Sequence, residues 1–382
     1  MQEKKLKLVV GVTAPGSVNL LRGQLGYFAD QGFETYLIAP DDPKTISFCE
    51  QEGCILLPVK IEREISLWHD IVSLWTIYRH LRRVKPDIVN VGTPKMGLLG
   101  MIAAKLSGVK RRIYTCRGFR YEHEAGFMRK VLMLMEWLSG ACAQDVICIS
   151  PSVKELAIQD KLFPERKCKV INKGSSNGIN TEKFNRANIT DTEKITLQND
   201  LKLSGSFVYG FVGRLIDRKG VNELYHAFDA VYKTDSNTRL LIVGPLEFEQ
   251  LSDKELVKTL KFHPGIVMPG RTDNVPLYLS VMDVFVLPAW WEGFGNVLVE
   301  AAAMGIPVIS TKGTGTRDAV SDGFNGVLVD VKNVDQLIAA MLLLKSDNKK
   351  RMGMGLNGLE WAKNFNRVKI WEGMHTMYIN KL

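Results

Sequence analysis

Two glutamates that stand eight residues apart, Glu292 and Glu300, enclose the segment of this chain with the clearest capacity for chemistry. An apolar run over residues 284–288 precedes them and predicts a buried strand. Two glycines follow, and then helix-forming residues from 296 to 304. This order directs backbone N–H groups and the positive end of a helix at an anion, and the glycines let a ligand approach the backbone. The carboxylates would repel phosphate but accept hydrogen bonds from hydroxyl groups, so the segment predicts a nucleotide-sugar site.

Arg214 and Lys219 form a second set of side chains that could take part in a reaction. They follow an apolar run over residues 207–212 and stand on either side of a turn before a helix predicted over 220–232. Glycosyl transfer from a nucleotide sugar breaks an anomeric C–O bond and leaves charge on a diphosphate. Fixed positive groups beside that diphosphate lower the barrier, which suits these two side chains.

The elements that must position these residues alternate along the whole chain. The predicted strands cover residues 8–12, 35–39, 87–91, 112–115, 145–149, 207–212, 239–243, 266–268, 284–288, 307–310 and 326–329. The predicted helices cover residues 20–31, 67–84, 97–107, 127–143, 220–232, 296–304, 334–345 and 365–382. Alternating strands and helices form βαβ units with parallel sheets, so we expect an α/β protein with two doubly wound domains, joined by the polar segment over residues 180–206.

Length and composition agree with this plan. A chain of 382 residues, 46% hydrophobic and 24% charged, is typical of a soluble protein with two domains. No run approaches the ~18 apolar residues of a membrane-spanning helix, and the apolar part of the first sixteen residues is too short for a signal peptide. The six cysteines lack the spacing of a metal site, so we expect reduced thiols in the cytoplasm.

Positive charge is concentrated in the first half of the chain. Residues 1–190 hold 28 Lys and Arg against 19 Asp and Glu, and the net charge of the whole chain is +9. Such a field attracts nucleic acid, acidic lipid or a diphosphate, although a solvated helix surface would also carry it. A nucleic-acid protein would place aromatic residues among Lys and Arg on a strand. Trp68, Trp75 and Trp137 instead follow helical patterns, so nucleic acid is not an expected partner.

Several blocks of the second half resemble the retaining GT-B glycosyltransferases of family 4, and among them the bacterial capsular and exopolysaccharide enzymes. The blocks are the E-x7-E segment over residues 288–309, the elements over 271–273 and 322–326, and the G-R-L-x-x-x-K-G element within 212–220. The resemblance implies two Rossmann-like domains that face a central cleft. Residues 1–185 would bind the acceptor, residues 200–364 would bind the nucleotide sugar, and a helix over 365–382 would cross back to the first domain.

The same resemblance implies roles for individual residues. Arg214 and Lys219 would hold the diphosphate, Glu300 would accept hydrogen bonds from the ribose, and Glu292 would meet the transferred sugar near its 3-hydroxyl. We expect Glu292 to position the sugar and stabilise charge rather than to act as a nucleophile, because this family is described as reacting on one face of the sugar. Glu292, Arg214 and Lys219 are therefore the expected catalytic residues. The expected donor-binding residues are Gly16, Gly213, Arg214, Lys219, Arg271, Gly295, Asn296 and Glu300.

The first half departs from the family after the strand predicted over 112–115. Many relatives carry a histidine near the sugar there, whereas this chain has Arg117, which cannot act as a base at neutral pH. Arg117 and Arg120 are instead expected to bind an acceptor diphosphate. Residues 122–124 are too few for a metal site and no D-x-D motif occurs, so we expect a metal-independent enzyme without a cofactor.

The resemblance and the basic first half together predict a retaining hexosyltransferase in the cytoplasm, on the inner face of the cell membrane. The resemblance implies that it moves a sugar from a UDP-sugar to a polyprenyl-diphosphate-linked saccharide in surface polysaccharide synthesis, with an N-acetylhexosamine as a candidate sugar. Its partners would be the nucleotide-sugar donor, the lipid-linked acceptor and an anionic membrane surface. A catalytically degenerate glycosyltransferase-like subunit and a soluble-acceptor glycosyltransferase are the alternatives. Donor sugar, acceptor, linkage and oligomeric state stay open.

Overall fold

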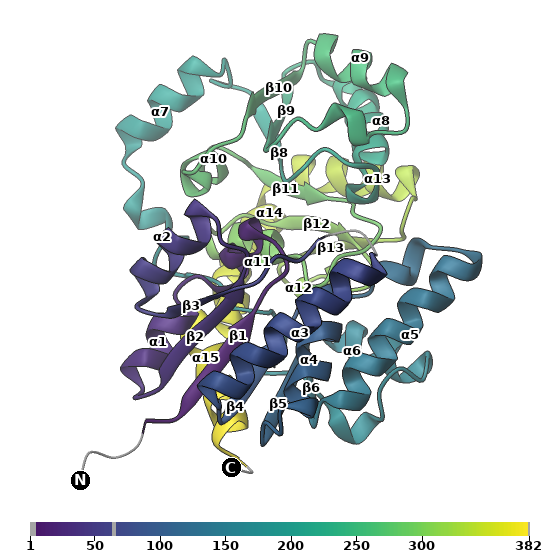
Figure 1. The fold of residues 1–382 in the computed structure, drawn as a ribbon. Coiled ribbons are helices and arrows are strands. Elements are labelled where there is room, and N and C mark those ends of the chain that lie inside the picture. The colour runs from purple at the N-terminus through teal and green to yellow at the C-terminus, as the bar shows by residue number, and fades with distance from the viewer. Residues whose placement is uncertain (1–4, 63–65, 381–382) are drawn as a thin grey trace. The chain divides into compact units, whose positions relative to one another are not determined.

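The computed structural model describes residues 5–62 and 66–380, which divide into two compact units. The first unit comprises residues 1–178 and 368–382, and the second comprises residues 179–367 (Figure 1). The segment over residues 180–206, predicted as a junction, thus belongs to the second unit. The last two residues of the helix predicted over 365–382 lie outside the described residues.

The first unit is built on a seven-stranded parallel sheet with the order β3-β2-β1-β4-β5-β6-β7. Its strands are β1 Lys7–Gly11, β2 Glu34–Ala39, β3 Ile55–Pro58, β4 Ile88–Val91, β5 Arg111–Cys116, β6 Asp145–Cys148 and β7 Cys168–Lys169. Its helices are α1 Gln24–Asp30, α2 Pro43–Glu52, α3 Leu67–Val84, α4 Pro94–Leu106, α5 Gly126–Cys142, α6 Pro151–Gln159 and α15 Arg367–Ile379. The strand order reverses between β1 and β4, as in a doubly wound fold.

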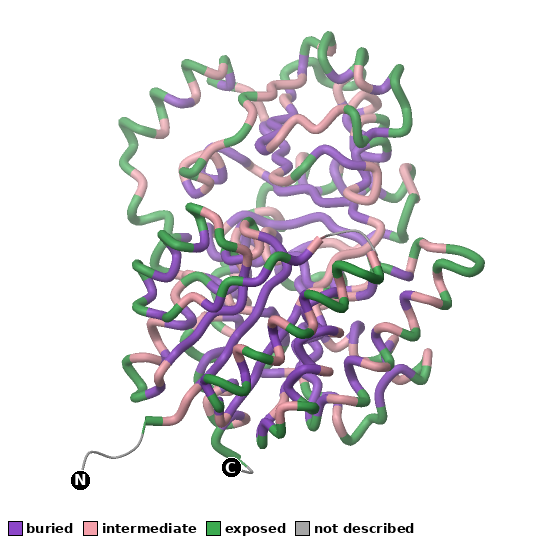
Figure 2. The backbone as a smooth tube through the Cα atoms, viewed as in Figure 1, coloured by how far each residue is buried: buried purple, intermediate pink, exposed green. Residues whose placement is uncertain are grey.

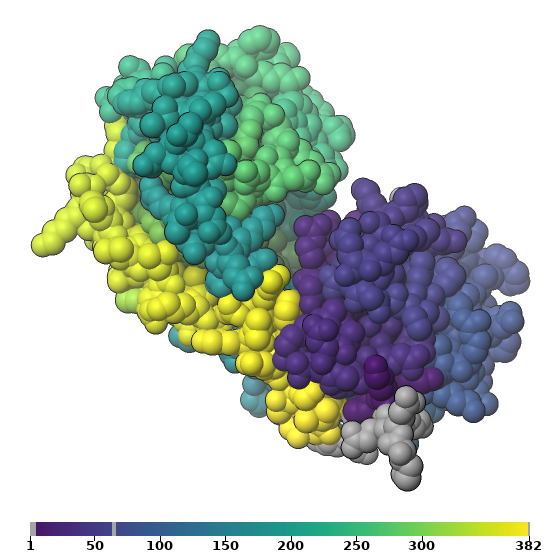
Figure 3. All heavy atoms as spheres, turned by 90° about the vertical axis from the view of Figure 1, so that its left-hand side faces the viewer, coloured from purple at the N-terminus to yellow at the C-terminus, as the bar shows by residue number. Residues whose placement is uncertain are grey.

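Helices cover both faces of this sheet. One apolar core joins the sheet to α3, α4, α5 and α6, and the other joins it to α1, α2 and α15. The C-terminal helix α15 therefore completes the core of the first unit. Asn90 of β4 donates a hydrogen bond to the Tyr378 hydroxyl at 2.6 Å, and Arg111 donates to the Met377 carbonyl at 2.7 Å. In Figure 3 the yellow spheres of this C-terminal segment adjoin the purple spheres of the N-terminal residues.

The second unit has a six-stranded parallel sheet with the order β10-β9-β8-β11-β12-β13. Its strands are β8 Phe207–Val212, β9 Thr238–Val243, β10 Ile266–Gly270, β11 Val284–Leu287, β12 Val308–Thr311 and β13 Gly326–Val329. Its helices are α7 Asp191–Asp200, α8 Val221–Thr234, α9 Lys254–Phe262, α10 Val275–Ser280, α11 Asn296–Ala303, α12 Thr316–Ala319, α13 Val334–Ser346 and α14 Asn348–Ala362. The central strands β8 and β11 are buried along nearly their whole length (Figure 2).

One predicted helix is interrupted. The sequence predicts a single helix over residues 20–31, but the chain forms a 3-10 helix over Pro15–Leu21 and then α1. Gly23 stands between them with a left-handed φ of 80°, which a helix interior does not allow. Within the described residues, no helix has the length and hydropathy that a membrane crossing requires.

Candidate active site

The predicted donor residues gather where the strand order of the second sheet reverses. Strand β8 has β9 on one side and β11 on the other. From β8 the sheet is extended on one side by β9 and β10, and then on the other side by β11, β12 and β13. In open parallel sheets, ligands bind at the carboxyl ends of the strands beside such a reversal. The loops that leave β8 and β11 there contain Lys219 and Glu292.

Lys219 and Glu292 form an ion pair between Nζ and Oε1. Both side chains are largely withdrawn from water, with 14% and 15% of their surfaces exposed. Arg218 Nη1 lies 3.7 Å from the other carboxylate oxygen, Oε2. The structure thus brings together two of the predicted catalytic residues, from different loops, with a second cation beside them.

The carboxyl group of Glu292 is held ionised by its neighbours. Burial by itself would raise its pKa, but the charges of Lys219, Arg218 and Arg214 outweigh burial and lower it. The stability that this carboxylate contributes is therefore present above the pKa of the unfolded chain and lost as the pH falls through the lower folded pKa. At neutral pH the site presents a fixed negative group among three cations.

Gly220 lets the loop that carries Lys219 approach the loop that carries Glu292. Its φ is 71°, and a Cβ added there would stand 2.0 Å from the Pro288 carbonyl oxygen. The Trp290 N–H also donates to the Arg218 carbonyl at 2.8 Å, which ties the two loops together. A glycine is therefore required at this position both by conformation and by space.

We expect Gly220→Ala to destabilise the protein by about 3 kcal/mol and to impair donor binding. The strain of a left-handed alanine and the collision of its Cβ with the Pro288 carbonyl oxygen both contribute to this loss of stability. Urea unfolding followed by circular dichroism measures the loss. Gly205→Ala is the matched control, since Gly205 has a φ of 73° with nothing within 4 Å of an added Cβ. Equal losses in the two variants would show that the contact between the loops has no importance for stability.

A third loop, after β12, supports Glu292 from the other side. The Glu292 N–H donates to the Thr314 carbonyl at 2.9 Å. A Cβ on Gly315, whose φ is 76°, would lie 2.2 Å from the Glu292 carbonyl oxygen. The sequence prediction did not include this loop. The glycines at 313 and 315, directly after an apolar strand, are the signal that would have indicated it.

Arg218 is a further residue that the sequence prediction left without a role. Besides its contact with Glu292, its guanidinium lies over the Trp291 ring, 4.8 Å from the centroid. The neighbouring indole of Trp290 donates from Nε1 to Glu223 of α8 at 2.9 Å. The contact with Trp291 holds the Arg218 guanidinium beside the Glu292 carboxylate. Its position next to Lys219, a predicted ligand, is the feature of the sequence that could have indicated a role for Arg218.

Helix α11 carries Glu300 behind the turn at Gly295. Gly295 has a φ of 82° and is the N-cap of α11, and Asn296 is its first residue. Asn296 and Glu300 are four residues apart in this helix and so lie on one side of it. Burial raises the pKa of Glu300 to about 7, against a smaller opposing effect of Lys183. A half-buried carboxyl group with a raised pKa suits a ligand that donates hydrogen bonds to it.

The pH dependence of Glu300 gives a second test. Because the pKa rises from 4.5 to about 7 on folding, the ligand-free protein loses stability as the pH rises across this window. We expect Glu300→Gln to raise the melting temperature at pH 8 by about 3–6 °C and to have little effect at pH 5. Scanning calorimetry at both values measures the difference. Glu360→Gln, at an exposed residue, is the control, and equal effects of Glu300→Gln at both pH values would contradict the assignment.

The remaining donor residues are placed less closely together. Gly213 follows β8 directly, and its carbonyl is so close to Gly244 that a Cβ there would stand 2.0 Å away. Arg214 is half exposed, and its Nη1 lies 3.6 Å from Glu247 Oε2. Arg271 follows the edge strand β10 and is 72% exposed, with β9 and β8 between it and β11. No contact in the described part of the chain joins Arg271 to the Lys219–Glu292 pair.

In the first unit, the loops after β1 and β5 contain the other predicted residues, and the loop after β4 lies between them. Gly16 lies in the 3-10 helix after β1 with nothing within 4 Å of an added Cβ, so the protein itself does not demand a glycine there. The hydroxyls of Thr13 and Thr93 meet at 2.7 Å and join the loops after β1 and β4. The structure therefore gives Gly16 a place at the reversal of the first sheet without giving it a contact.

Arg117 follows β5 and turns toward the loop after β4. Its Nε would lie 3.2 Å from a Cβ on Gly92. Nε and Nη1 are buried and have no hydrogen-bond partner among the described residues. Burial lowers the pKa of Arg117 to about 10, so the guanidinium stays charged at neutral pH. Because the charged donors of Arg117 are buried without acceptors, they favour an anionic ligand at this place. Arg120, the other predicted acceptor residue, is exposed.

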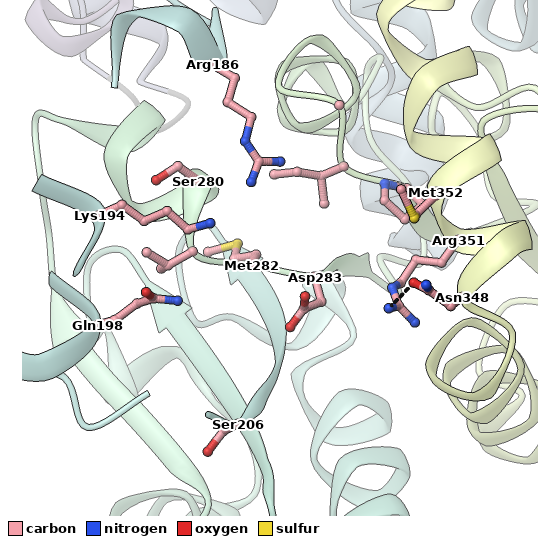
Figure 4. Close-up of a pocket in the computed structure, with 14 residues that line it drawn as sticks. Arg186, Lys194, Gln198, Ser206, Ser280, Met282, Asp283, Asn348, Arg351 and Met352 are labelled. Carbon is pink, nitrogen blue, oxygen red and sulfur yellow. Dashed lines mark hydrogen bonds between the residues drawn. The ribbon is translucent and has the colours of Figure 1, made fainter. Parts of the chain in front are cut away.

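A separate cavity of about 260 Å³ lies at the opposite edge of the second sheet (Figure 4). It is lined by residues that precede β8, β11 and β12, such as Ser206, Asp283 and Pro307, and by Arg351 of α14. None of the predicted donor residues lines it. As for metals, residues 5–62 and 66–380 contain no group of three or more His, Cys, Asp or Glu that could hold an ion.

Comparison with known proteins decides the family. A family model described as glycosyltransferase family 4 matches residues 16–183, and one described as glycosyl transferases group 1 matches residues 193–361. The capsular polysaccharide biosynthesis glycosyltransferase CapM of Staphylococcus aureus is 36% identical over 98% of this chain and 97% of its own length. This chain belongs to glycosyltransferase family 4. The glycosyltransferase has the GT-B fold, which confirms the prediction of two Rossmann-like domains.

Two further comparisons are informative about the relatives of this glycosyltransferase. The UDP-Gal:alpha-D-GlcNAc-diphosphoundecaprenol alpha-1,3-galactosyltransferase of Escherichia coli is 31% identical over 89% of each chain. The crystal structure of Anabaena Alr3699/HepE in complex with UDP and glucose has a TM-score of 0.82, covers 97% of this chain and 98% of its own, and is 19% identical. The first supports the family at the level of sequence, and the second supports the fold.

Proposed function

We propose that this glycosyltransferase is a retaining, metal-independent enzyme that moves a sugar from a UDP-sugar to a polyprenyl-diphosphate-linked saccharide in the synthesis of a surface polysaccharide. The observation that carries the proposal is the Lys219–Glu292 ion pair between the loops after β8 and β11, with Arg218 beside it. A pair of this kind offers a cation for a diphosphate and a carboxylate for sugar hydroxyls at the edge of the sheet where ligands bind.

The donor would lie with its diphosphate against the cations and the first turn of α11. Lys219, Arg218 and Arg214 supply positive charge, and the α11 N-terminus adds backbone N–H groups after Gly295. Glu300, one turn inside α11, would accept hydrogen bonds from the ribose. The pKa of about 7 for its carboxyl group means that ribose binding would favour the ionised form and lower that pKa.

In the reaction, the cations would stabilise the charge that develops on the leaving diphosphate. Lys219 is already fixed by Glu292, so little reorganisation accompanies bond breaking. Glu292 would hold the sugar by its hydroxyls, and the departing diphosphate would take the proton of the acceptor hydroxyl on the same face. The arginine and lysine side chains would thus do the work for which other enzymes use a metal ion.

The donor and acceptor classes rest on different supports. The name of the Escherichia coli relative pairs a UDP-sugar with a diphosphoundecaprenol acceptor, and the Anabaena structure holds UDP. In this chain, the buried and unpartnered donors of Arg117 suit the diphosphate of such an acceptor. The enzyme would act at the inner face of the cell membrane, where polyprenyl-linked saccharides are extended, and an N-acetylhexosamine is the first sugar to test.

A transfer assay tests the proposal. A panel of UDP-sugars is combined with a short polyprenyl-diphosphate-linked sugar, with and without EDTA, and the anomeric configuration of the product is read by NMR. We expect retention of configuration, no loss of rate with EDTA, and a KM for the acceptor that rises about tenfold or more in Arg117→Ala. An inverted product, or activity that EDTA abolishes, would contradict the corresponding part of the proposal.

A further inference from the structure

Helix α3 exposes an unusual row of large apolar side chains. Its buried side is formed by Ser73, Ile77, Leu81 and Val84, which face the core of the first unit. On the opposite side, Trp68 is 73% exposed and Trp75 is 60% exposed, and Trp75 stacks on Tyr78 at 5.4 Å. The other apolar residues of this row are Leu67, Ile71 and Val72. Two exposed tryptophans in one helix need an explanation, because water does not favour such a surface.

Helix α5 repeats this arrangement. Leu132, Glu136 and Ser139 are buried, whereas Phe127 is 80% and Trp137 49% exposed. Leu134 and Lys130 lie between these two aromatic residues on the exposed side. The spacing of three and four residues places them in one row, away from the sheet.

The two rows belong to one surface. Helices α3 and α5 both pack on α4, most of whose residues are buried (Figure 1). Both helices run against the strand direction, because each one leads into a parallel strand. Their N-terminal ends, with Trp68 and Phe127, therefore lie at the same edge of the sheet as Arg117. We call the exposed sides of α3 and α5 the α3–α5 face.

Positive charge borders the apolar residues of this face. The row on α3 continues into Arg79, Arg82 and Arg83, all exposed, and α5 adds Lys130. The acidic residue of α3, Asp70, is neutralised by an ion pair with the buried Lys95 of α4 at 2.6 Å. The face thus combines tryptophan and phenylalanine with a surplus of exposed arginine and lysine.

We propose that the α3–α5 face docks on the surface of an anionic lipid bilayer, with its aromatic side chains at the level of the headgroups. Helices that lie in a membrane interface have this composition, with aromatic and aliphatic residues on one side and Lys or Arg beside them. Anionic headgroups attract the arginines. The inference deepens the proposed function and rests on it for its biological sense, because docking would bring the edge of the sheet with Arg117 to the lipid-linked acceptor.

A second copy of this chain is the other occupant that an apolar face admits. Charge argues against it, because two such faces would place the arginines of α3 near those of a like-charged partner. An anionic bilayer instead complements both parts of the face at once. The oligomeric state in solution distinguishes the two possibilities, because only docking of a second copy predicts a dimer.

The test uses the full chain and vesicles of equal parts phosphatidylglycerol and phosphatidylcholine. In flotation, we expect the wild type to bind, and the double variant Trp68→Ser/Trp75→Ser to lose about tenfold or more in partitioning. Arg79→Ala/Arg82→Ala should weaken binding and reduce its dependence on salt. The matched control is Phe262→Ser/Leu356→Ser, at residues of the second unit that are 84% and 67% exposed, and it should bind like the wild type.

Each outcome has a clear meaning. Wild-type protein that does not bind the vesicles at low salt, or a control variant that loses as much as the tryptophan variant, overturns the proposal. So does a dimer, seen by light scattering, that the tryptophan variant converts to monomer. UDP binding and the melting temperature of each variant show that it is folded. Vesicle binding by Glu300→Gln separates the two proposals, because this variant should lose donor affinity while it docks normally.

Discussion

Lys219→Ala is expected to lower kcat by about 10²–10³-fold. The variant removes the cation nearest to Glu292, and with it the charge that would stabilise the leaving diphosphate. It also leaves the Glu292 carboxylate with Arg218 at 3.7 Å as its nearest described cation, in a site that is largely withdrawn from water. Steady-state rates of sugar transfer, with donor and acceptor both saturating, measure the effect.

Lys233→Ala provides the matched control. Lys233 lies in the last turn of α8, the helix that follows the Lys219 loop. It forms an ion pair with Asp229 at 2.6 Å, but its side chain is 73% exposed. Surface pairs contribute little, so we expect kcat to stay within about twofold of the wild type. If Lys219→Ala kept more than about a tenth of the wild-type kcat, the role of this lysine in the departure of the diphosphate would be refuted.

Glu292→Gln is expected to reduce kcat by about 10²-fold, and the wild type is expected to form no covalent sugar–protein adduct at any stage. The amide keeps the shape of the side chain and the backbone bond to Thr314, but it removes the charge that holds Lys219 and that faces the sugar. Rates are measured with the natural donor. Mass spectrometry of the wild type incubated with a 2-fluoro donor analogue, which slows the release of any covalent intermediate, tests the adduct.

A mass gain of one sugar on the peptide that contains Glu292 would contradict the positioning role. Glu292 would then be a nucleophile, and the enzyme would use a double displacement. The lowered pKa of the carboxyl group is compatible with either role, because both require the ionised form at neutral pH. The mass measurement therefore decides what the geometry of the free enzyme leaves open.

Much of the fold follows from local patterns in the sequence. The helix predicted over residues 67–84 and the strands predicted over 207–212 and 326–329 agree with α3, β8 and β13 to the residue. The apolar residues of α3 recur at the spacing of one buried face, and those of β8 and β13 form short apolar runs, which are buried in the middle of β8 and partly buried in the edge strand β13. Strand β3 was not predicted, because Ile55 and Pro58 face solvent at the edge of the sheet. Helix α7 falls in the segment predicted as a junction, because its sequence is mostly polar and only Leu197 is buried. A capping box at Thr190 and Glu193 starts the helix.

The candidate site was predictable where a motif fixed the residue and less so where a tertiary contact did. Lys219 and Glu292 could be named from their motifs, yet nothing local indicated that they form an ion pair. The contribution of Arg218 arises from a cation–π contact with Trp291 and from its distance to Glu292, both set by the approach of two loops. The backbone support from Thr314 likewise depends on the adjacency of β11 and β12. Such pairings come from sheet order, which periodicity does not reveal.

The most direct test of the central claim is calorimetric titration of UDP, GDP, ADP and CMP into the wild type and Glu300→Ala. We predict that UDP binds about tenfold or more tightly than the other nucleotides, and that Glu300→Ala weakens UDP by about 10–100-fold, because hydrogen bonds to a charged group are lost. Tighter binding of GDP or ADP would contradict the donor class, and an unchanged UDP affinity in Glu300→Ala would contradict the site. If no nucleotide bound at all, the chain would be a glycosyltransferase-like subunit without catalysis.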